Sequence, residues 1–169
     1  LGEWQKAQTN LNLSWQILQS ETGTKKLPIL AQIINNKGNL EFVLGQSETA
    51  LNTWLQAEKL YSENNNELGI IGVKINQAQA LQRLGLNLQS VKILTEVEQK
   101  LQTKPDSKLK LIALKNYSDS LRLIGKIEES KPFLEQSLTM AQKLEDQENI
   151  SQYYLSLGNL YYSNQREDK

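Results

Sequence analysis

Apolar residues recur at steps of three and four along most of the chain. Residues 27–63 show this pattern twice, once before Gly45 and once after it. The spacing places the apolar side chains on one face of a helix. Glycine accepts the left-handed backbone of a tight reversal, so we predict two helices folded back on each other at Gly45. A hairpin of this size cannot bury its apolar face alone, which predicts further copies stacked beside it.

The copies are marked by glycines 40 residues apart, at Gly45, Gly85 and Gly125, with Gly2 standing 43 residues before the first of them. Small residues stand at fixed offsets from these markers. The column seven positions before each marker or its equivalent contains Gly38, Ala78, Ser118 and Gly158, and the column five positions after contains Ala7, Ala50, Ser90 and Ser130. Small side chains allow two helix backbones to approach closely. Three columns in phase predict a repeat architecture.

We therefore predict an all-α fold, a right-handed superhelical solenoid of antiparallel helix pairs that forms a single domain over residues 1–169. Residues 1–22 are expected to form the second helix of an incomplete repeat, and residues 146–169 the first helix of another. Complete repeats are expected at residues 23–63, 64–103 and 104–145. Because both ends cut through a repeat, we expect the chain to be a fragment of a longer protein.

Several local features predict details of these helices. Asp106 or Ser107 is expected to cap the helix that follows, and Pro132 predicts a kink or a late start of its helix. The last helix has no partner helix after it, so its apolar face is expected to be exposed or covered by crystal or dimer contacts. The core is expected to include Trp4, Trp15 and Trp54, and most of Tyr153, Tyr154, Tyr161 and Tyr162.

The composition excludes several classes of function. Lys plus Arg and Asp plus Glu number 19 each, so there is no basic excess to neutralise phosphates, and we expect neither nucleic-acid nor membrane-surface binding. The sequence contains no histidine and no cysteine, which removes the common zinc sites and catalysis by Cys–His or Ser–His pairs. No catalytic residue, metal site or cofactor is predicted. No apolar run is long enough to span a membrane and no signal peptide is visible, so we expect a cytoplasmic protein.

The repeat pattern, small-x6-Gly-x4-small, resembles that of the tetratricopeptide repeat. The resemblance covers the whole chain and includes Leu-Gly-Asn-Leu-Tyr at 157–161 and Gly-Gln-Ser-Glu-Thr-Ala-Leu at 45–51. The period of 40 is longer than the common unit of about 34 residues. It is similar to the long repeats of kinesin light chains and of multidomain bacterial signalling proteins, as is Ser-Lys-Pro-Phe-Leu at 130–134.

The resemblance implies a binding groove lined by the first helix of each repeat. In tetratricopeptide domains that hold extended peptides, asparagine two positions before the small residue typically bonds the peptide backbone; that column contains Asn36, Asn76 and Asn116. A primary amide offers a donor and an acceptor together, which suits the paired N–H and C=O of an extended chain. The other groove candidates are Asn39, Gln79, Asp119 and Asn159, one position after the small residue, and Arg83, Lys115 and Arg122, as contacts for acidic groups or a terminal carboxylate. The alternative interpretation is that the amides are ordinary solvated or inter-helix amides and that the charged side chains only keep the surface soluble.

The function that this pattern favours is a protein-interaction scaffold that binds an extended peptide or a partner segment. A second hypothesis is a regulatory array that packs on an effector domain of its own polypeptide. Long repeats rich in Asn and Gln resemble those that precede caspase-like peptidase domains in bacteria, particularly cyanobacteria. A third is self-association into a homo-oligomer through exposed end helices. An enzyme fits the sequence least well.

Overall fold

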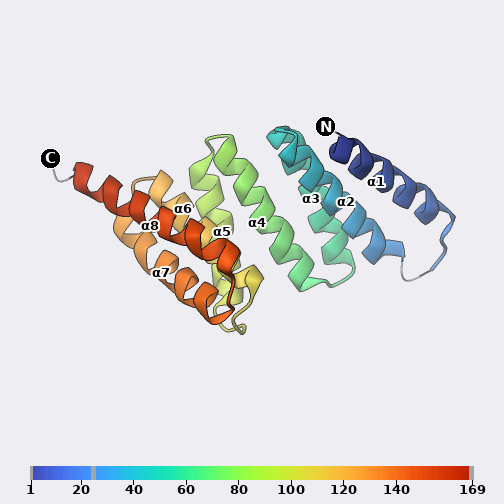
Figure 1. Ribbon diagram of the computed structural model, residues 1–169. Helices are drawn as coiled ribbons and strands as arrows, with labels where there is room; N and C mark the ends of the chain where they lie inside the picture. Colours follow the sequence, from blue (N-terminus) through green and yellow to red (C-terminus); the bar gives the residue numbers. More distant parts are fainter. Residues whose placement is uncertain (1, 24–25, 168–169) are drawn as a thin grey trace. The chain divides into compact units, whose positions relative to one another are not determined.

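The computed structural model describes residues 2–23 and 26–167, and this part of the chain consists of helices joined by short connections, without a strand (Figure 1). The all-α prediction is confirmed. The helices are α1 (Gly2–Ser20), α2 (Lys26–Val43), α3 (Ser47–Glu63), α4 (Glu67–Arg83), α5 (Asn87–Leu101), α6 (Lys108–Leu123), α7 (Ile127–Lys143) and α8 (Gln147–Glu167).

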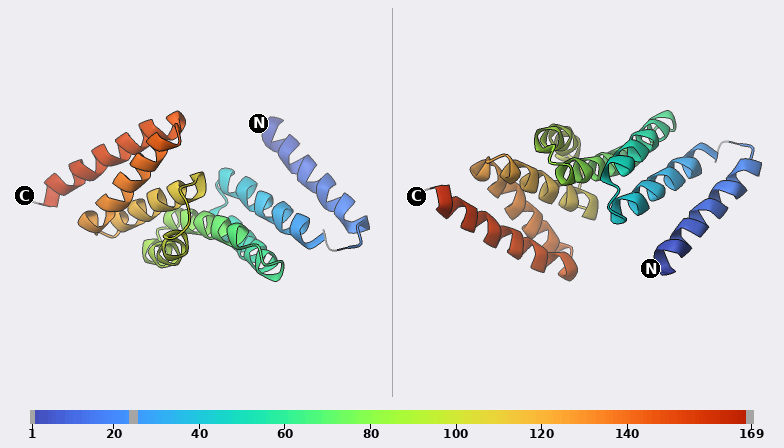
Figure 2. Two further views of the ribbon diagram at one scale, coloured as in Figure 1. Left: turned by 90° about the horizontal axis from the view of Figure 1, so that it is seen from below. Right: turned by 90° about the horizontal axis from the view of Figure 1, so that it is seen from above.

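Contacts divide the chain into two compact units, residues 1–84 and 85–169. In the first unit, helices α1 to α4 each pack on the next, and α4 also contacts α2. The second unit repeats this arrangement with α5 to α8, where α8 also contacts α6. Within each unit, consecutive helices run in opposite directions (Figure 2). The predicted packing of adjacent helices as antiparallel pairs is therefore confirmed.

The marker glycines make the predicted reversals. Gly45, Gly85 and Gly125 have φ of +83°, +76° and +81°, a region that L side chains rarely adopt. After α2, the backbone N–H of Gln46 donates to the carbonyl of Glu41 at 2.9 Å. A bond of this span from beyond a left-handed residue closes a Schellman motif and satisfies a carbonyl at the end of the helix. Glycine at the period of the repeat therefore ends one helix and allows the next to begin.

The core of the first unit is centred on Trp54, which is 1% exposed. Its ring lies against Gly38, where an added Cβ would come within 2.5 Å of Trp54 Nε1. The ring also packs on Phe42, with centroids 5.4 Å apart. The indole N–H donates to the carbonyl of Asn35 at 3.3 Å and to Asn39 Oδ1 at 3.2 Å. The close approach predicted from the small residue at position 38 is confirmed, because no larger side chain fits beside this ring.

The second unit has its own core, between α6, α7 and α8. Its buried apolar residues are Leu111, Leu114, Ile127, Leu134, Met140, Ala141 and Tyr153. The column of small residues five positions after the marker glycines contributes Ser90 and Ser130, both fully buried. The Ser90 and Ser120 hydroxyls are hydrogen-bonded at 2.9 Å, so the close contact of α5 with α6 leaves neither hydroxyl unsatisfied.

Two local predictions have different outcomes. Ser107 is the N-cap of α6 and its side chain accepts a bond from the backbone N–H of Lys110, as expected. The late start predicted from Pro132 is wrong, because α7 already begins at Ile127 and contains the proline. Pro132 and Glu128, four residues before it, are both exposed. The backbone bond that proline cannot make therefore lies on the exposed side of the helix, where water can reach the carbonyl of Glu128.

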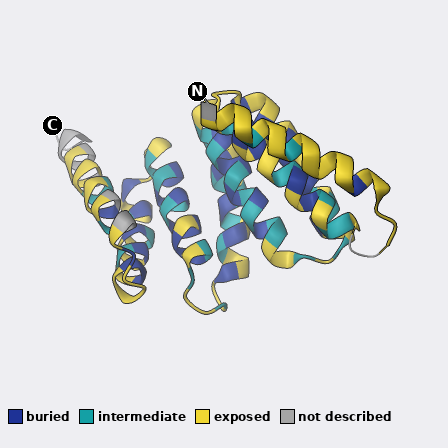
Figure 3. Cartoon of the chain, turned by 45° about the vertical axis from the view of Figure 1, so that its right-hand side comes forward, coloured by how far each residue is buried: buried dark blue, intermediate teal, exposed yellow. Residues whose placement is uncertain are grey.

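The prediction that aromatic residues of the end helices belong to the core is largely wrong. Trp4 and Trp15 of α1 and Tyr154, Tyr161 and Tyr162 of α8 are between 41% and 62% exposed. Figure 3 shows α1 as a largely exposed helix beside the buried faces of its neighbours. In the described part of the chain, α1 packs only on α2, and α8 only on α7 and α6. The expected exposure of the apolar residues of α8 holds for Tyr154, Tyr161 and Tyr162, whereas Tyr153 is buried.

Tyr153 is the buried tyrosine of α8, and its position predicts a dependence of stability on pH. Burial raises the pKa of its hydroxyl above the ordinary value of 10.0, and the negative charges of Asp146 and Asp119 add to the shift. Above pH 10 the unfolded chain ionises this tyrosine while the folded chain keeps it neutral, so the free energy of unfolding should fall as pH rises. Urea unfolding at a series of pH values should show a shallower fall for Tyr153→Phe. An unchanged slope would contradict the assignment.

Candidate functional site

Four amide side chains of the predicted groove lie on α2 and α4; we call Asn36, Asn39, Asn76 and Gln79 the amide row. Asn36 and Asn39 are exposed, whereas Asn76 and Gln79 are half-buried. Asn76 Nδ2 donates to Asn39 Oδ1 at 3.2 Å and lies 3.4 Å from Asn35 Oδ1. The structure therefore brings two members of the row into direct contact, although they are 37 residues apart in the sequence.

The internal bonds of the amide row leave specific atoms open. Asn39 Oδ1 accepts from Trp54 Nε1 and from Asn76 Nδ2, so both bonds use the oxygen of Asn39, and the second uses the nitrogen of Asn76. Among the described residues, the Asn39 nitrogen and the Asn76 oxygen have no partner, and neither has the amide of Asn36. A donor and an acceptor thus stand side by side, which is the pairing that an extended backbone presents.

Arg83 is held within the first unit. Its Nη1 donates to the backbone carbonyl of Phe42 at 2.9 Å, and its guanidinium carbon lies 3.7 Å from the centre of the Phe42 ring. Phe42 is in the last turn of α2, where a positive charge meets the negative end of the helix dipole. The side chain therefore joins the C-terminal ends of α4 and α2, and its use as a contact for an acidic ligand stays a prediction.

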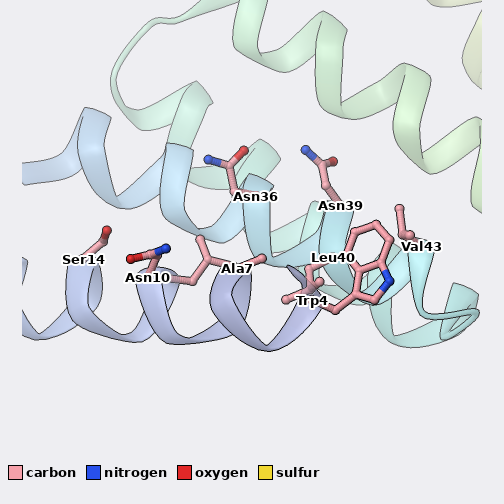
Figure 4. A pocket seen from close by; sticks show the side chains of 9 residues that line it. Trp4, Ala7, Asn10, Ser14, Asn36, Asn39, Leu40 and Val43 are labelled. Atoms are coloured by element: carbon pink, nitrogen blue, oxygen red, sulfur yellow. The ribbon is translucent and has the colours of Figure 1, made fainter. Parts of the chain in front are cut away.

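A cleft of about 430 Å³ lies between α1 and α2 (Figure 4). Figure 4 shows Asn36 and Asn39 on the α2 side and Asn10 and Ser14 along α1. The cleft is lined by Trp4, Ala7, Asn10, Leu11, Ser14, Asn36, Asn39, Leu40 and Val43. Its α1 side was not predicted from the sequence, because Trp4 was assigned to the core. Among the described residues α1 packs on α2 alone, which leaves Trp4 exposed.

The candidates in the second unit differ in accessibility. Lys115 Nζ pairs with Asp119 Oδ2 at 2.7 Å, one helical turn away on α6. Asn116 is 7% exposed, so it offers little surface to a ligand. Arg122 is half-buried near the end of α6, and Asn159 is exposed on α8. The accessible candidates of this unit are therefore Arg122 and Asn159, while Lys115 and Asp119 largely neutralise one another.

In residues 2–23 and 26–167, no three acidic, histidine or cysteine side chains gather closely enough to hold a metal ion. Within the same ranges, none of the helices combines the length and the apolarity that crossing a membrane requires. The features that remain as candidates for function are the amide row and the cleft between α1 and α2.

No protein-family model matches the sequence, and no curated protein sequence matches it either. Solved structures do match. BtubC (BKLC) from P. vanneervenii is similar with a TM-score of 0.76 at 16% identity, over 95% of this chain and 65% of that one. A putative kinesin light chain from Podospora anserina with nearly identical TPR-like repeats is similar with a TM-score of 0.64 at 16% identity, over 94% and 82% of the two chains.

These similarities define the fold. The chain spans just under two thirds of the length of BtubC, and both structures match almost the whole of it. At 16% identity, structural similarity establishes the arrangement of helices and does not extend to ligands. The resemblance that the 40-residue period indicates is thus confirmed in three dimensions: the chain has the all-helical repeat fold of the tetratricopeptide-like proteins.

Proposed function

We propose that this chain is a protein-interaction module that binds an extended peptide segment of a partner along the amide row of α2 and α4. The observation that carries the proposal is the pair of open atoms at the centre of the row, the Asn39 nitrogen and the Asn76 oxygen. An extended backbone offers a carbonyl and an N–H on the same edge, and the pair matches both without reading side chains.

Rigidity supports the proposal. Asn39 is fixed by bonds from Trp54, which is fully buried, and from Asn76 on the neighbouring helix. Side chains that are already ordered lose little conformational entropy when a ligand binds, so more of each contact contributes to affinity. Next to the row, Leu40 and Val43 line the cleft and offer apolar surface for the side chains of the peptide. The arrangement favours a segment with alternating polar contacts and small apolar side chains.

The proposal predicts that Asn36→Ala combined with Asn76→Ala weakens peptide binding by about 30-fold, since each lost amide contact costs about 1 kcal/mol. The probe is a peptide selected on the purified chain from a random-sequence library, with its dissociation constant measured by titration calorimetry. Asn36 is exposed, but Asn76→Ala also removes the bonds to Asn39 and Asn35, so the variant is expected to keep its helical content with a slightly lower melting temperature.

Asn52→Ala is the matched control, because Asn52 is an exposed asparagine on α3, outside the amide row. It should bind the selected peptide as the unmodified chain does. If selection enriches no peptide, or if the double variant binds an enriched peptide with unchanged affinity, the amide row is not a peptide site and the proposal is wrong.

A further inference from the structure

The hydrogen bonds inside the amide row determine which atom of each amide faces its neighbour. The indole nitrogen of Trp54 can only donate, so the amide atom of Asn39 that lies 3.2 Å from it is the oxygen Oδ1. Trp54 is 1% exposed and its ring is packed against Gly38 and Phe42, so the indole cannot turn to present another edge. Asn39 is therefore held in one orientation, although its side chain is exposed.

The same constraint passes from Asn39 to Asn76. Because Asn39 Oδ1 is an acceptor, the amide atom of Asn76 that lies 3.2 Å from it is the donor Nδ2. Asn35 Oδ1 lies 3.4 Å from the same nitrogen and is a second acceptor for it. Turning either amide over would bring two acceptors or two donors together and would lose a bond. The order of donors and acceptors along the row is thus fixed from Trp54 outward.

The atoms left open give the amide row a direction. Among the described residues, the unpartnered atoms of the pair are a donor on α2, the Asn39 nitrogen, and an acceptor on α4, the Asn76 oxygen. A ligand therefore meets an N–H at α2 and an oxygen at α4. Two amides that were free to turn over could serve a peptide in either direction, whereas this pair presents a single order.

An extended peptide is asymmetric in the same way. The N–H and C=O of one residue lie close together on the same edge of a strand, with the N–H nearer the N-terminal end. The C=O of one residue and the N–H two residues later are more widely spaced on that edge. The amides of Asn39 and Asn76 are in direct contact, so their open atoms suit the close pair that a single residue presents.

We propose that the bond from Trp54 fixes the direction in which a peptide binds, from α4 to α2. The N–H of one peptide residue bonds to Asn76 Oδ1, and the C=O of the same residue accepts from Asn39 Nδ2. The close pair of a reversed peptide would place oxygen against oxygen and N–H against N–H, so neither bond would form. Trp54 is buried and acts through Asn39, as a positioning residue. This inference rests on the peptide binding proposed above and adds a direction to it.

Asn39→Asp removes the open donor and keeps the rest of the row. A carboxylate has the shape of the amide and still accepts from Trp54 and Asn76, so the melting temperature should stay close to that of the unmodified chain. It has no N–H for the peptide carbonyl and sets an oxygen against it, so affinity for the selected peptide should fall at least about tenfold. Unchanged affinity would show that Asn39 is only structural and would overturn the proposal.

Asn52→Asp is the control for the added charge, because Asn52 is exposed on α3, outside the amide row. It should bind the selected peptide as the unmodified chain does. An equal loss of affinity in both variants would assign the effect to charge alone and would overturn the role of the Asn39 donor.

Photo-crosslinking measures the direction itself. The selected peptide is made with a benzophenone group at its N-terminal or at its C-terminal end, and the crosslinked residues are identified by mass spectrometry. The N-terminal group should react with α4, and the C-terminal group with α1 or α2. The reverse pattern, or crosslinks from both ends to both helices, would overturn the direction and leave the peptide site intact. Selection that enriches no peptide would overturn the proposed function as well, and this outcome is seen before any crosslinking.

Trp54→Phe tests the positioning role of the indole. Phenylalanine keeps an aromatic ring beside Phe42 but has no N–H, so the amides of Asn39 and Asn76 can turn over together. Each end of the bound peptide should then crosslink to both α2 and α4. A direction that is unchanged in this variant would overturn the role of Trp54. If circular dichroism shows that Trp54→Phe does not fold, the affinity of Asn39→Asp and the crosslinks of the unmodified chain decide.

Discussion

Trp54→Ala should lower the free energy of unfolding by about 3–5 kcal/mol. The indole is 1% exposed and fills the space between Gly38, Phe42 and the small residues of α3. Its removal leaves a cavity that the surrounding helices cannot close, since their own backbones already fix the spacing. It also leaves the carbonyl of Asn35 and the amide of Asn39 without the bonds from the indole N–H. Urea unfolding followed by far-UV circular dichroism measures the loss.

Leu55→Ala provides the comparison for this experiment. Leu55 follows Trp54 on α3 and is 49% exposed, so the same truncation there should cost no more than about 1 kcal/mol. Leucine and alanine also have similar helix propensities, which keeps the backbone contribution small. Equal losses for the two variants would show that the Trp54 ring does not hold the first unit together.

The helices could be predicted closely because their signal is local and repeated. The glycines at 45, 85 and 125 end helices through a backbone conformation that other residues adopt at a cost. Ala50 and Ser90 are fully buried because two backbones meet at their positions. Each of these requirements acts on a single residue and recurs at the same period, so a single sequence is enough to show it.

Exposure at the ends of the array could not be predicted in the same way. Leu11 and Trp54 occupy equivalent positions in the second helices of their repeats. Leu11 nevertheless lines an open cleft, whereas Trp54 is buried. An amphipathic pattern shows which face of a helix is apolar. Whether another helix covers that face depends on the rest of the array, so Trp4 and Tyr162 carry core-like patterns and lie exposed.

The candidate site shows the same limit. Asn36 and Asn116 hold the same column of the repeat, but Asn36 is exposed and Asn116 is buried. The repeat fixes the direction of a side chain from its own helix, whereas the neighbouring helices decide how much of it water can reach. The bond between Asn39 and Asn76 and the tie between Arg83 and Phe42 could not be predicted either. Both interactions depend on the distance between two helices, and the period of the repeat does not give that distance.

Gly38→Ala and Gly158→Ala should change stability in opposite directions, although the two glycines occupy the same position of their repeats. At Gly38 the new methyl group would lie 2.5 Å from Trp54 Nε1 and 2.7 Å from Cδ1, and the buried ring cannot move away. Overpacking of this kind costs about 1–3 kcal/mol. At Gly158 the methyl group meets no neighbouring atom, and alanine in a helix gains about 0.5–1 kcal/mol over glycine. Urea unfolding of both variants at low concentration measures the contrast.

The origin of the contrast can be tested by removing the ring. In a Trp54→Ala background the Gly38→Ala methyl group has space, so the substitution should become neutral or stabilising, as at Gly158; two sites in contact are expected to be coupled in this way. A penalty that persists without the ring would place the clash elsewhere.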